Sequence, residues 1–275
     1  MNTESTTQST INIGINGAAG RMGRRLIDLA IADECLSLTA AIEPEGSPFA
    51  GEDAGLVAGA SSCGVAITSL AQLYSAIAPQ CVIDFSCNEA TGAILDYCLE
   101  KSVPLVVATT GLEPEILQRV EDAAARVGIV HAPNMSMAVN LSMKLAETAA
   151  GALAGQEDVD VEVIERHHRF KADSPSGTAL KFGELIAGKM GQTEHRHGRE
   201  GVIGARPATE IGYHAVRAGD NPGEHTIIFG MAGETIEIRV AATNRDCYAA
   251  GALAAARFLV DRAPGMYSMY DVLGL

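Results

Sequence analysis

Two adjacent histidines and three cationic side chains fall within one fifteen-residue stretch, ERHHRFKADSPSGTA, at residues 165–179. His167 and His168 can exchange a proton near neutral pH, and Lys171 is a cation that can also donate one. Residues 176–178, Ser-Gly-Thr, read as a helix cap, where hydroxyls, free N–H groups and the helix dipole favour an anion. The stretch therefore predicts a site that holds a carboxylate and protonates a bound substrate.

Two other interpretations of this stretch stand beside that one. A charged run is often an ordinary solvated strand end. A metal site is suggested by His195 and His197, which lie nearby in the sequence. Adjacent residues on a strand point to opposite faces, however, so His167 and His168 make a poor chelating pair. We therefore expect no metal.

The rest of the chain is acidic, with a net charge of -14 over 275 residues, which argues against nucleic acid or an anionic membrane as a partner. No apolar run is long enough to span a membrane. The first ten residues lack an apolar signal-peptide core, and we expect a disordered lead-in. The six cysteines form no C-x-x-C pair, so we interpret them as reduced thiols of a cytoplasmic protein.

A glycine turn predicts a second site. The apolar strand INIGIN (11–16) leads into GAAGRMG, which spaces Gly17, Gly20 and Gly23 three residues apart. Such a turn between a strand and a helix can hold a pyrophosphate on free N–H groups, although a glycine turn can also serve packing alone. Glu43 lies at the end of the next strand, where an acid bonds the ribose hydroxyls of a dinucleotide. We predict NADH or NADPH as cofactor and favour NADH, because Pro44 cannot contact a 2′-phosphate. Arg21 could still reach a phosphate, which leaves the preference open.

The first half of the chain alternates apolar strands with helices, which predicts a parallel sheet covered on both faces. Residues 44–64 are rich in Gly, Pro and Ser and are expected to form a long loop. The expected strands are 11–16, 38–43, 81–86, 104–111 and 128–134.

The pattern changes after residue 134. Four strands and two helices, 137–153 and 177–190, indicate an α+β domain, and the DNPG sequence at 220–223 is a turn signal. A final helix, 246–263, has small-residue faces suited to packing on the first domain. We therefore expect a Rossmann-type α/β domain formed by 1–134 and 245–275, and a second domain at 135–244 with a four-stranded mixed sheet.

These segments resemble the 4-hydroxy-tetrahydrodipicolinate reductase family, also called dihydrodipicolinate reductase, of bacterial lysine and diaminopimelate synthesis. The family signature E-x-H-H-x-x-K-x-D-A-P-S-G-T-A stands here as ERHHRFKADSPSGTA, with Ser174 in place of Ala. The resemblance covers nearly the whole chain after the N-terminal tail. Further matching pieces are GAAGRMG, IDFS, ATTG (108–111), APNMS (132–136), VRAGDNPGEHT (216–226) and YDVLGL (270–275).

The resemblance implies a homotetramer that uses NADH or NADPH to reduce a small cyclic dicarboxylate. His167 would be the acid/base residue and Lys171 the proton donor, although the sequence leaves open which of the two delivers the proton. His168 would bind substrate, and Ser176, Gly177 and Thr178 would hold a substrate carboxylate. The cofactor would contact Gly17, Ala18, Ala19, Gly20, Arg21, Met22, Gly23, Glu43, Ala108, Thr109, Thr110, Ala132, Pro133, Asn134 and Met135.

Two other functions are compatible with a nucleotide-binding domain. A dehydrogenase acting on an amino-acid semialdehyde would need a cysteine nucleophile, and no cysteine lies in an evident reactive setting. A nucleotide-sensing regulator would carry a basic helix-turn-helix or a partner-binding tail, and the sequence has neither.

Overall fold

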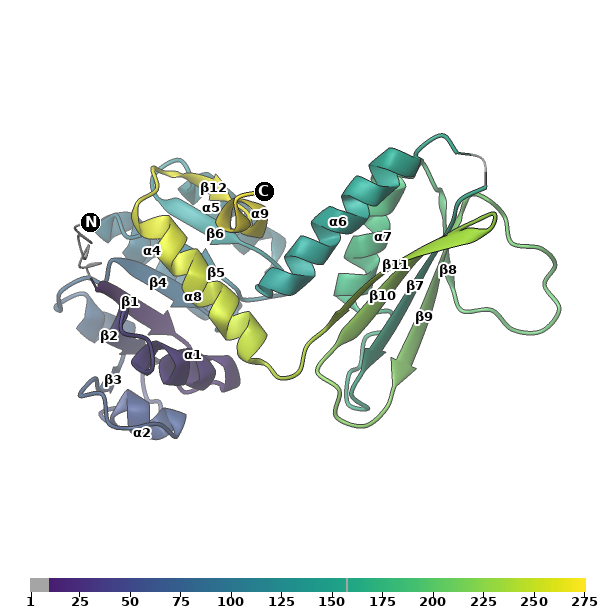
Figure 1. The fold of residues 1–275 in the computed structure, drawn as a ribbon. Helices are drawn as coiled ribbons and strands as arrows, with labels where there is room; N and C mark the ends of the chain where they lie inside the picture. Colours follow the sequence, from purple (N-terminus) through teal and green to yellow (C-terminus); the bar gives the residue numbers. More distant parts are fainter. Residues whose placement is uncertain (1–9, 157) are drawn as a thin grey trace, which may run out of the picture. The chain divides into compact units, whose positions relative to one another are not determined.

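The computed structural model describes residues 10–156 and 158–275, and the chain divides into two compact units (Figure 1). The first unit runs to Met137 and resumes at Asp246, and the second is Ala138–Arg245. Most of the expected N-terminal lead-in, residues 1–9, lies outside the described residues.

The first unit is built on a seven-stranded sheet in which every strand pair is parallel. Its strands are mainly apolar because both faces are covered. The spatial order β12-β6-β5-β4-β1-β2-β3 confirms the expected Rossmann-type sheet. The strands are β1 (Ile11–Asn16), β2 (Leu36–Ile42), β3 (Ile67–Thr68), β4 (Cys81–Asp84), β5 (Leu105–Val107), β6 (Gly128–His131) and β12 (Gly265–Tyr267).

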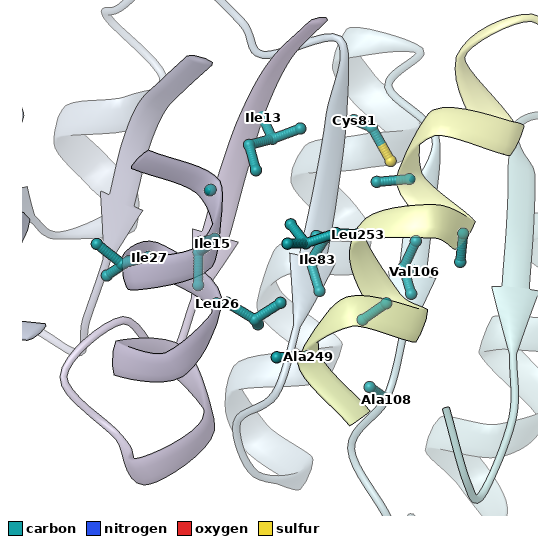
Figure 2. Packing of buried hydrophobic residues seen from close by; sticks show 14 of the residues in the cluster. Ile13, Ile15, Leu26, Ile27, Cys81, Ile83, Val106, Ala108, Ala249 and Leu253 are labelled. Atoms are coloured by element: carbon teal, nitrogen blue, oxygen red, sulfur yellow. The ribbon is translucent and has the colours of Figure 1, made fainter. Parts of the chain in front are cut away.

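Helices cover both faces of this sheet, and two apolar clusters form the core. Successive strand residues alternate between the clusters: Ile83 packs with α1 and α8, and its neighbour Val82 packs with α4 and α5. Figure 2 shows Leu253 of α8 beside Ile83 and Leu26 of α1 near Ile15. The helices are α1 (Arg21–Ile31), α2 (Ala54–Ala58), α3 (Leu70–Leu73), α4 (Asn88–Lys101), α5 (Pro114–Ala123), α8 (Asp246–Val260) and α9 (Met269–Leu273).

Five short elements depart from the expectation, and the first is β3, a strand of two residues. The expected loop 44–64 contains the one-turn helix α2, which Asp53 caps by accepting a hydrogen bond from the N–H of Leu56. A single helical turn, α3, follows β3. β12 and α9 add a strand and a helix after α8. Elements of two to five residues are too short to show a hydrophobic period, so the sequence gives them no clear signal.

The second unit contains a mixed sheet of five strands in the order β11-β10-β7-β9-β8. β7 lies at its centre, parallel to β9 and antiparallel to β10. Figure 1 shows α6 and α7 side by side along this sheet, and Lys189 of α7 forms an ion pair with Glu147 of α6. The elements are α6 (Met137–Leu153), β7 (Asp160–His167), α7 (Gly177–Met190), β8 (Glu194–His197), β9 (Glu210–Arg217), β10 (Glu224–Met231) and β11 (Glu234–Ala241).

The expected four-stranded sheet is wrong by one strand. β8 pairs in parallel with β9 at the edge of the sheet, in a segment that reads as a polar loop. All four of its side chains are exposed, so the alternation that signals a strand is absent. The turn at 220–223 joins β9 to β10, which lie on opposite sides of β7 and therefore do not form a hairpin.

Tight packing between α7 and β9 gives a test of this arrangement. A Cβ on Gly183 would lie 1.7 Å from the hydroxyl oxygen of Tyr213, whereas a Cβ on Gly188 of the same helix meets nothing within 4 Å. We expect Gly183→Ala to lower the free energy of unfolding by about 1–3 kcal/mol through overpacking. Gly188→Ala should raise it by about 0.5–1 kcal/mol. Urea unfolding followed by circular dichroism measures both, and equal stabilities would contradict the packing.

Candidate active site

The glycine turn after β1 leads directly into α1 at the carboxyl edge of the parallel sheet. Gly17 has φ +80°, and a Cβ there would lie 2.6 Å from the carbonyl oxygen of Phe85. A Cβ on Gly23 would lie 2.1 Å from the carbonyl oxygen of Gly17, so α1 packs directly on the turn. A bound group can therefore approach the backbone and the free N–H groups at the start of α1 closely. These residues fit a dinucleotide pyrophosphate.

Glu43 follows β2, and its Oε1 accepts a hydrogen bond from the N–H of Ala19 at 2.7 Å. Glu43 also lines a cavity of about 320 Å³ together with Pro44, Glu45 and Glu89. Among the described residues that line this cavity, none is Lys or Arg. The carboxylates of Glu43, Glu45 and Glu89 are therefore the only charged groups among the described residues that line it.

The other expected cofactor residues follow β5 and β6, which are neighbours in the sheet. Thr110 and Pro133 are exposed there, whereas Ala108, Ala132 and Met135 are buried. The register pairs Val107 with His131, the last residues of the two strands, so the two segments begin side by side. The buried members can shape the backbone at this edge, and the exposed ones can contact a ligand.

Asp84, at the end of β4, is fully buried. Its hydrogen bonds connect the end of β1, helix α4 and the segment after β5. Its carboxylate accepts hydrogen bonds from Asn16 Nδ2 at 2.7 Å and from the hydroxyls of Thr91 at 2.6 Å and Thr109 at 2.8 Å. A fourth hydrogen bond comes from the hydroxyl of Ser86. Burial raises the pKa of Asp84, against the opposing effect of these bonds. The IDFS segment was matched in the sequence, but no role was assigned to its acid.

In the second unit, His167 is the last residue of β7 and is 7% exposed. Its Nδ1 lies 2.6 Å from Oε2 of Glu165, which is fully buried. Residues two apart on a strand share a face, so both side chains point to the same side of β7. Burial lowers the pKa of His167, while the hydrogen bond and charge of Glu165 act to raise it.

The carboxylate of Glu165 has further partners from two other elements. Arg217 donates to it twice, with Nη1 2.7 Å from Oε2 and Nη2 2.7 Å from Oε1. The N–H of Ser176 donates to Oε1 at 3.0 Å. Burial would raise the pKa of Glu165, but the hydrogen bonds from Arg217, His167 and Ser176 hold it below its ordinary value. Glu165 is therefore ionised at neutral pH.

Ser176 is buried and caps the N-terminus of α7. Its Oγ accepts a hydrogen bond from the N–H of Ala179 at 3.2 Å and lies 3.1 Å from Nε2 of His225. Burial lowers the pKa of His225 to about 4, so this ring is neutral at pH 7. The hydroxyl and the N–H of Ser176 are thus both engaged within the protein, whereas Gly177, the next residue, is exposed.

Lys171 and His168 complete the expected set. The Nζ of Lys171 forms an ion pair with Asp173 at 2.8 Å, and the charge of Lys171 acts to lower the pKa of His167. The N–H of His168 donates to the carbonyl of Asn221 at 2.8 Å, which fixes the backbone at the end of β7. Nδ1 of His168 is buried and has no hydrogen-bond partner among the described residues.

Sequence reasoning assigned no role to Glu165, Arg217, His225 or Asp84. Glu165 carried a usable signal, because it lies two residues before His167 on the same strand. Arg217 and His225 lie within the matched segment 216–226, but their contact with the histidine depends on the pairing of β7 with β9 and β10.

In the described part of the chain, no group of three His, Cys, Asp or Glu side chains is placed to hold a metal ion. Burial raises the pKa values of the Cys81, Cys98 and Cys247 thiols, which makes them poor nucleophiles. None of the described helices is long and apolar enough to cross a membrane.

Comparison with known proteins gives matches over both units. Residues 11–135 match the family model described as dihydrodipicolinate reductase, N-terminus, and residues 138–273 match the C-terminus model of the same family. The chain is 56% identical to the 4-hydroxy-tetrahydrodipicolinate reductase of Rhodopirellula baltica over 270 residues, covering 96% of each chain. It is 45% identical to the protein of the same name from Nitrosospira multiformis, covering 97% of this chain and 99% of that one.

Solved structures agree. The dipicolinate-bound dihydrodipicolinate reductase of Paenisporosarcina sp. TG-14 is 26% identical, with a TM-score of 0.75, covering 95% of this chain and 98% of that one. An amine dehydrogenase from Mycobacterium smegmatis, at 11% identity and a TM-score of 0.62, shares the fold alone. With both family models matched in order and relatives of this identity over nearly its whole length, the chain belongs to the dihydrodipicolinate reductase family.

Proposed function

We propose that this protein uses NADH or NADPH to reduce 4-hydroxy-tetrahydrodipicolinate (dihydrodipicolinate) to tetrahydrodipicolinate, in lysine and diaminopimelate biosynthesis. One observation carries the proposal beyond family membership: a titratable imidazole, His167, lies on a buried carboxylate that also holds the N-terminus of α7. This arrangement places a proton-transfer group beside an anion-binding helix end, which suits a ring that bears carboxylates.

The substrate carboxylate would bind at the start of α7. Gly177 is exposed, and a Cβ there would meet nothing within 4 Å, so a ligand can approach this residue, whose N–H donates to the carboxylate of Asp173. Thr178 follows in the first turn of α7, where the helix dipole favours an anion. Ser176 supports this turn, because its N–H donates to Glu165 and its Oγ accepts from the N–H of Ala179. Lys171 and His168 supply the cationic or hydrogen-bonding groups nearby. The dipicolinate bound to the Paenisporosarcina relative is a ring of the same dicarboxylate class.

The 4-hydroxyl of the substrate must leave as water, and a hydride and a proton must add across the unsaturated bond that results. When bound, NADH or NADPH supplies the hydride. His167 and Lys171 are the two groups able to supply the proton, and both lie near the end of β7. His167 has its Nδ1 on Glu165, which leaves Nε2 as the atom that exchanges a proton with the substrate.

The first unit would bind the nucleotide, with the glycine turn on the pyrophosphate and Glu43 on the ribose. Glu43 bonds Ala19 within the turn, so the acid and the turn are already fixed relative to each other. The acidic cavity beside Pro44 favours NADH over NADPH. The expected homotetramer, cytoplasmic location and domain limits at residues 134 and 245 stay predictions.

The direct test is the loss of NADH absorbance when the protein meets freshly made substrate. We expect Lys171→Ala and His167→Ala each to cut kcat by about 10²–10⁴-fold, because each removes a candidate acid. Lys181→Ala is the control, since this lysine is exposed on α7 and pairs with Glu184. Near wild-type rates for both site variants would reject their roles, and a wild-type protein that oxidises neither cofactor would reject the proposed function.

The cofactor preference can be reversed at the residue after Glu43. Pro44→Arg would place a guanidinium in the cavity, where it can bond a 2′-phosphate. We expect kcat/KM for NADPH to rise roughly 10-fold relative to NADH, the value of one charged hydrogen bond. Pro44→Ala, which removes the proline without adding a cation, should leave the ratio unchanged. A wild-type preference for NADPH would show that the acidic cavity does not decide the cofactor.

A further inference from the structure

The carboxylate of Glu165 is saturated with donors from three elements. Oε2 faces Nδ1 of His167 at 2.6 Å and accepts from Nη1 of Arg217 at 2.7 Å. Oε1 accepts from Nη2 of Arg217 at 2.7 Å and from the N–H of Ser176 at 3.0 Å. An ionised carboxylate can only accept hydrogen bonds, so the atom of His167 that faces it must carry a hydrogen.

The opposite nitrogen of the same ring faces a glycine. A Cβ on Gly223 would lie 2.9 Å from Nε2 of His167, and Gly223 has φ +152°, which disfavours other residues. The position is thus kept clear of side-chain atoms next to Nε2. Because Nδ1 keeps its hydrogen in both protonation states, Nε2 is the nitrogen that gains and loses the proton.

We propose that Glu165, held by Arg217, is the positioning residue that fixes His167 as the Nδ1–H tautomer and ties it rigidly to the N-terminus of α7. The inference rests on the proposed function and deepens it. It assigns the proton transfer to Nε2 and couples that atom to the substrate-carboxylate end of the site through one buried side chain. Glu165 itself touches no substrate.

Four titratable or charged groups face the His167 ring, and the pH behaviour depends on all of them. Glu165 lies on the same strand, Arg217 on β9 and Lys171 on the loop after β7, and the His225 ring on β10 is 5.2 Å away, centroid to centroid. Glu165 acts to raise the pKa of His167, and Lys171 and Arg217 act to lower it. Neutralising Glu165 therefore removes the raising influence and leaves the lowering ones.

The experiment is Glu165→Gln, read by nitrogen-15 NMR of the histidine rings in the full chain. The His167 signals are assigned by their loss in His167→Gln. In the wild type we expect neutral His167 with hydrogen on Nδ1 and none on Nε2. In Glu165→Gln we expect a mixed tautomer population and a lower pKa, because the glutamine amide can donate as well as accept.

Kinetics give a second readout. If His167 donates the proton, activity falls as pH rises through its pKa, so the variant should lose activity at lower pH than the wild type. We expect kcat to fall roughly 10- to 100-fold, as for loss of a carboxylate that orients a functional histidine. KM for the substrate should rise as well, since the N-cap of α7 loses the same partner.

Glu162→Gln is the matched control. Glu162 lies on the opposite face of β7 and is also held by arginines, Arg199 and Arg206, and by His214. The Glu162→Gln variant should leave the tautomer and the pKa of His167 unchanged, and its activity should fall at the same pH as that of the wild type. Unchanged values in Glu165→Gln, or wild-type His167 carrying its hydrogen on Nε2, would overturn the inference.

A failure of the tautomer inference can be distinguished from a failure of the proposed function. The tautomer is measured without substrate, so it decides the inference even if the wild type proves inactive on the proposed substrate. An active wild type whose Glu165→Gln variant behaves normally rejects the inference and keeps the function. If the variant does not fold, the wild-type tautomer measurement still decides which nitrogen carries the hydrogen.

Discussion

The buried carboxylate of Glu165 is the constraint on which the candidate site depends. A fully buried charge is costly unless its hydrogen-bonding capacity is filled. Here a bidentate guanidinium, an imidazole and a backbone N–H fill it. The three donors lie on different elements: Arg217 on β9, Ser176 at the N-cap of α7, and His167 on β7 itself. Satisfying one charge therefore fixes three parts of the site at once.

The first unit also contains a buried carboxylate, that of Asp84, but its donors are neutral and its pKa shifts in the opposite direction. Asp84 is as buried as Glu165, but its partners are an amide and three hydroxyls. Neutral donors offset burial less than a guanidinium does, so the pKa of Asp84 is raised while that of Glu165 is lowered. Both acids lie at the ends of central strands, where they connect loops that are distant in sequence.

Much of this architecture is readable from the sequence, for physical reasons. Apolar strands such as β5 indicate a sheet covered on both faces, and the glycine spacing at Gly17 and Gly23 reflects contacts that allow no Cβ. The edge strand β8 was missed because an exposed strand needs no apolar pattern. The partners of Glu165 were missed because strand register, which places Arg217 opposite His167, is not encoded by any local pattern.

The path of the chain through the first unit has a consequence for how it is made. The apolar face of Ile13, Ile83 and Val106 is completed by α8, which is encoded after the whole of the second unit. A ribosome therefore releases most of the parallel sheet more than a hundred residues before the helix that covers it. Until Asp246–Val260 emerges, the part of that face which α8 covers is exposed to water or to a chaperone. A chain truncated before this helix would expose apolar surface on its sheet and would be prone to aggregate.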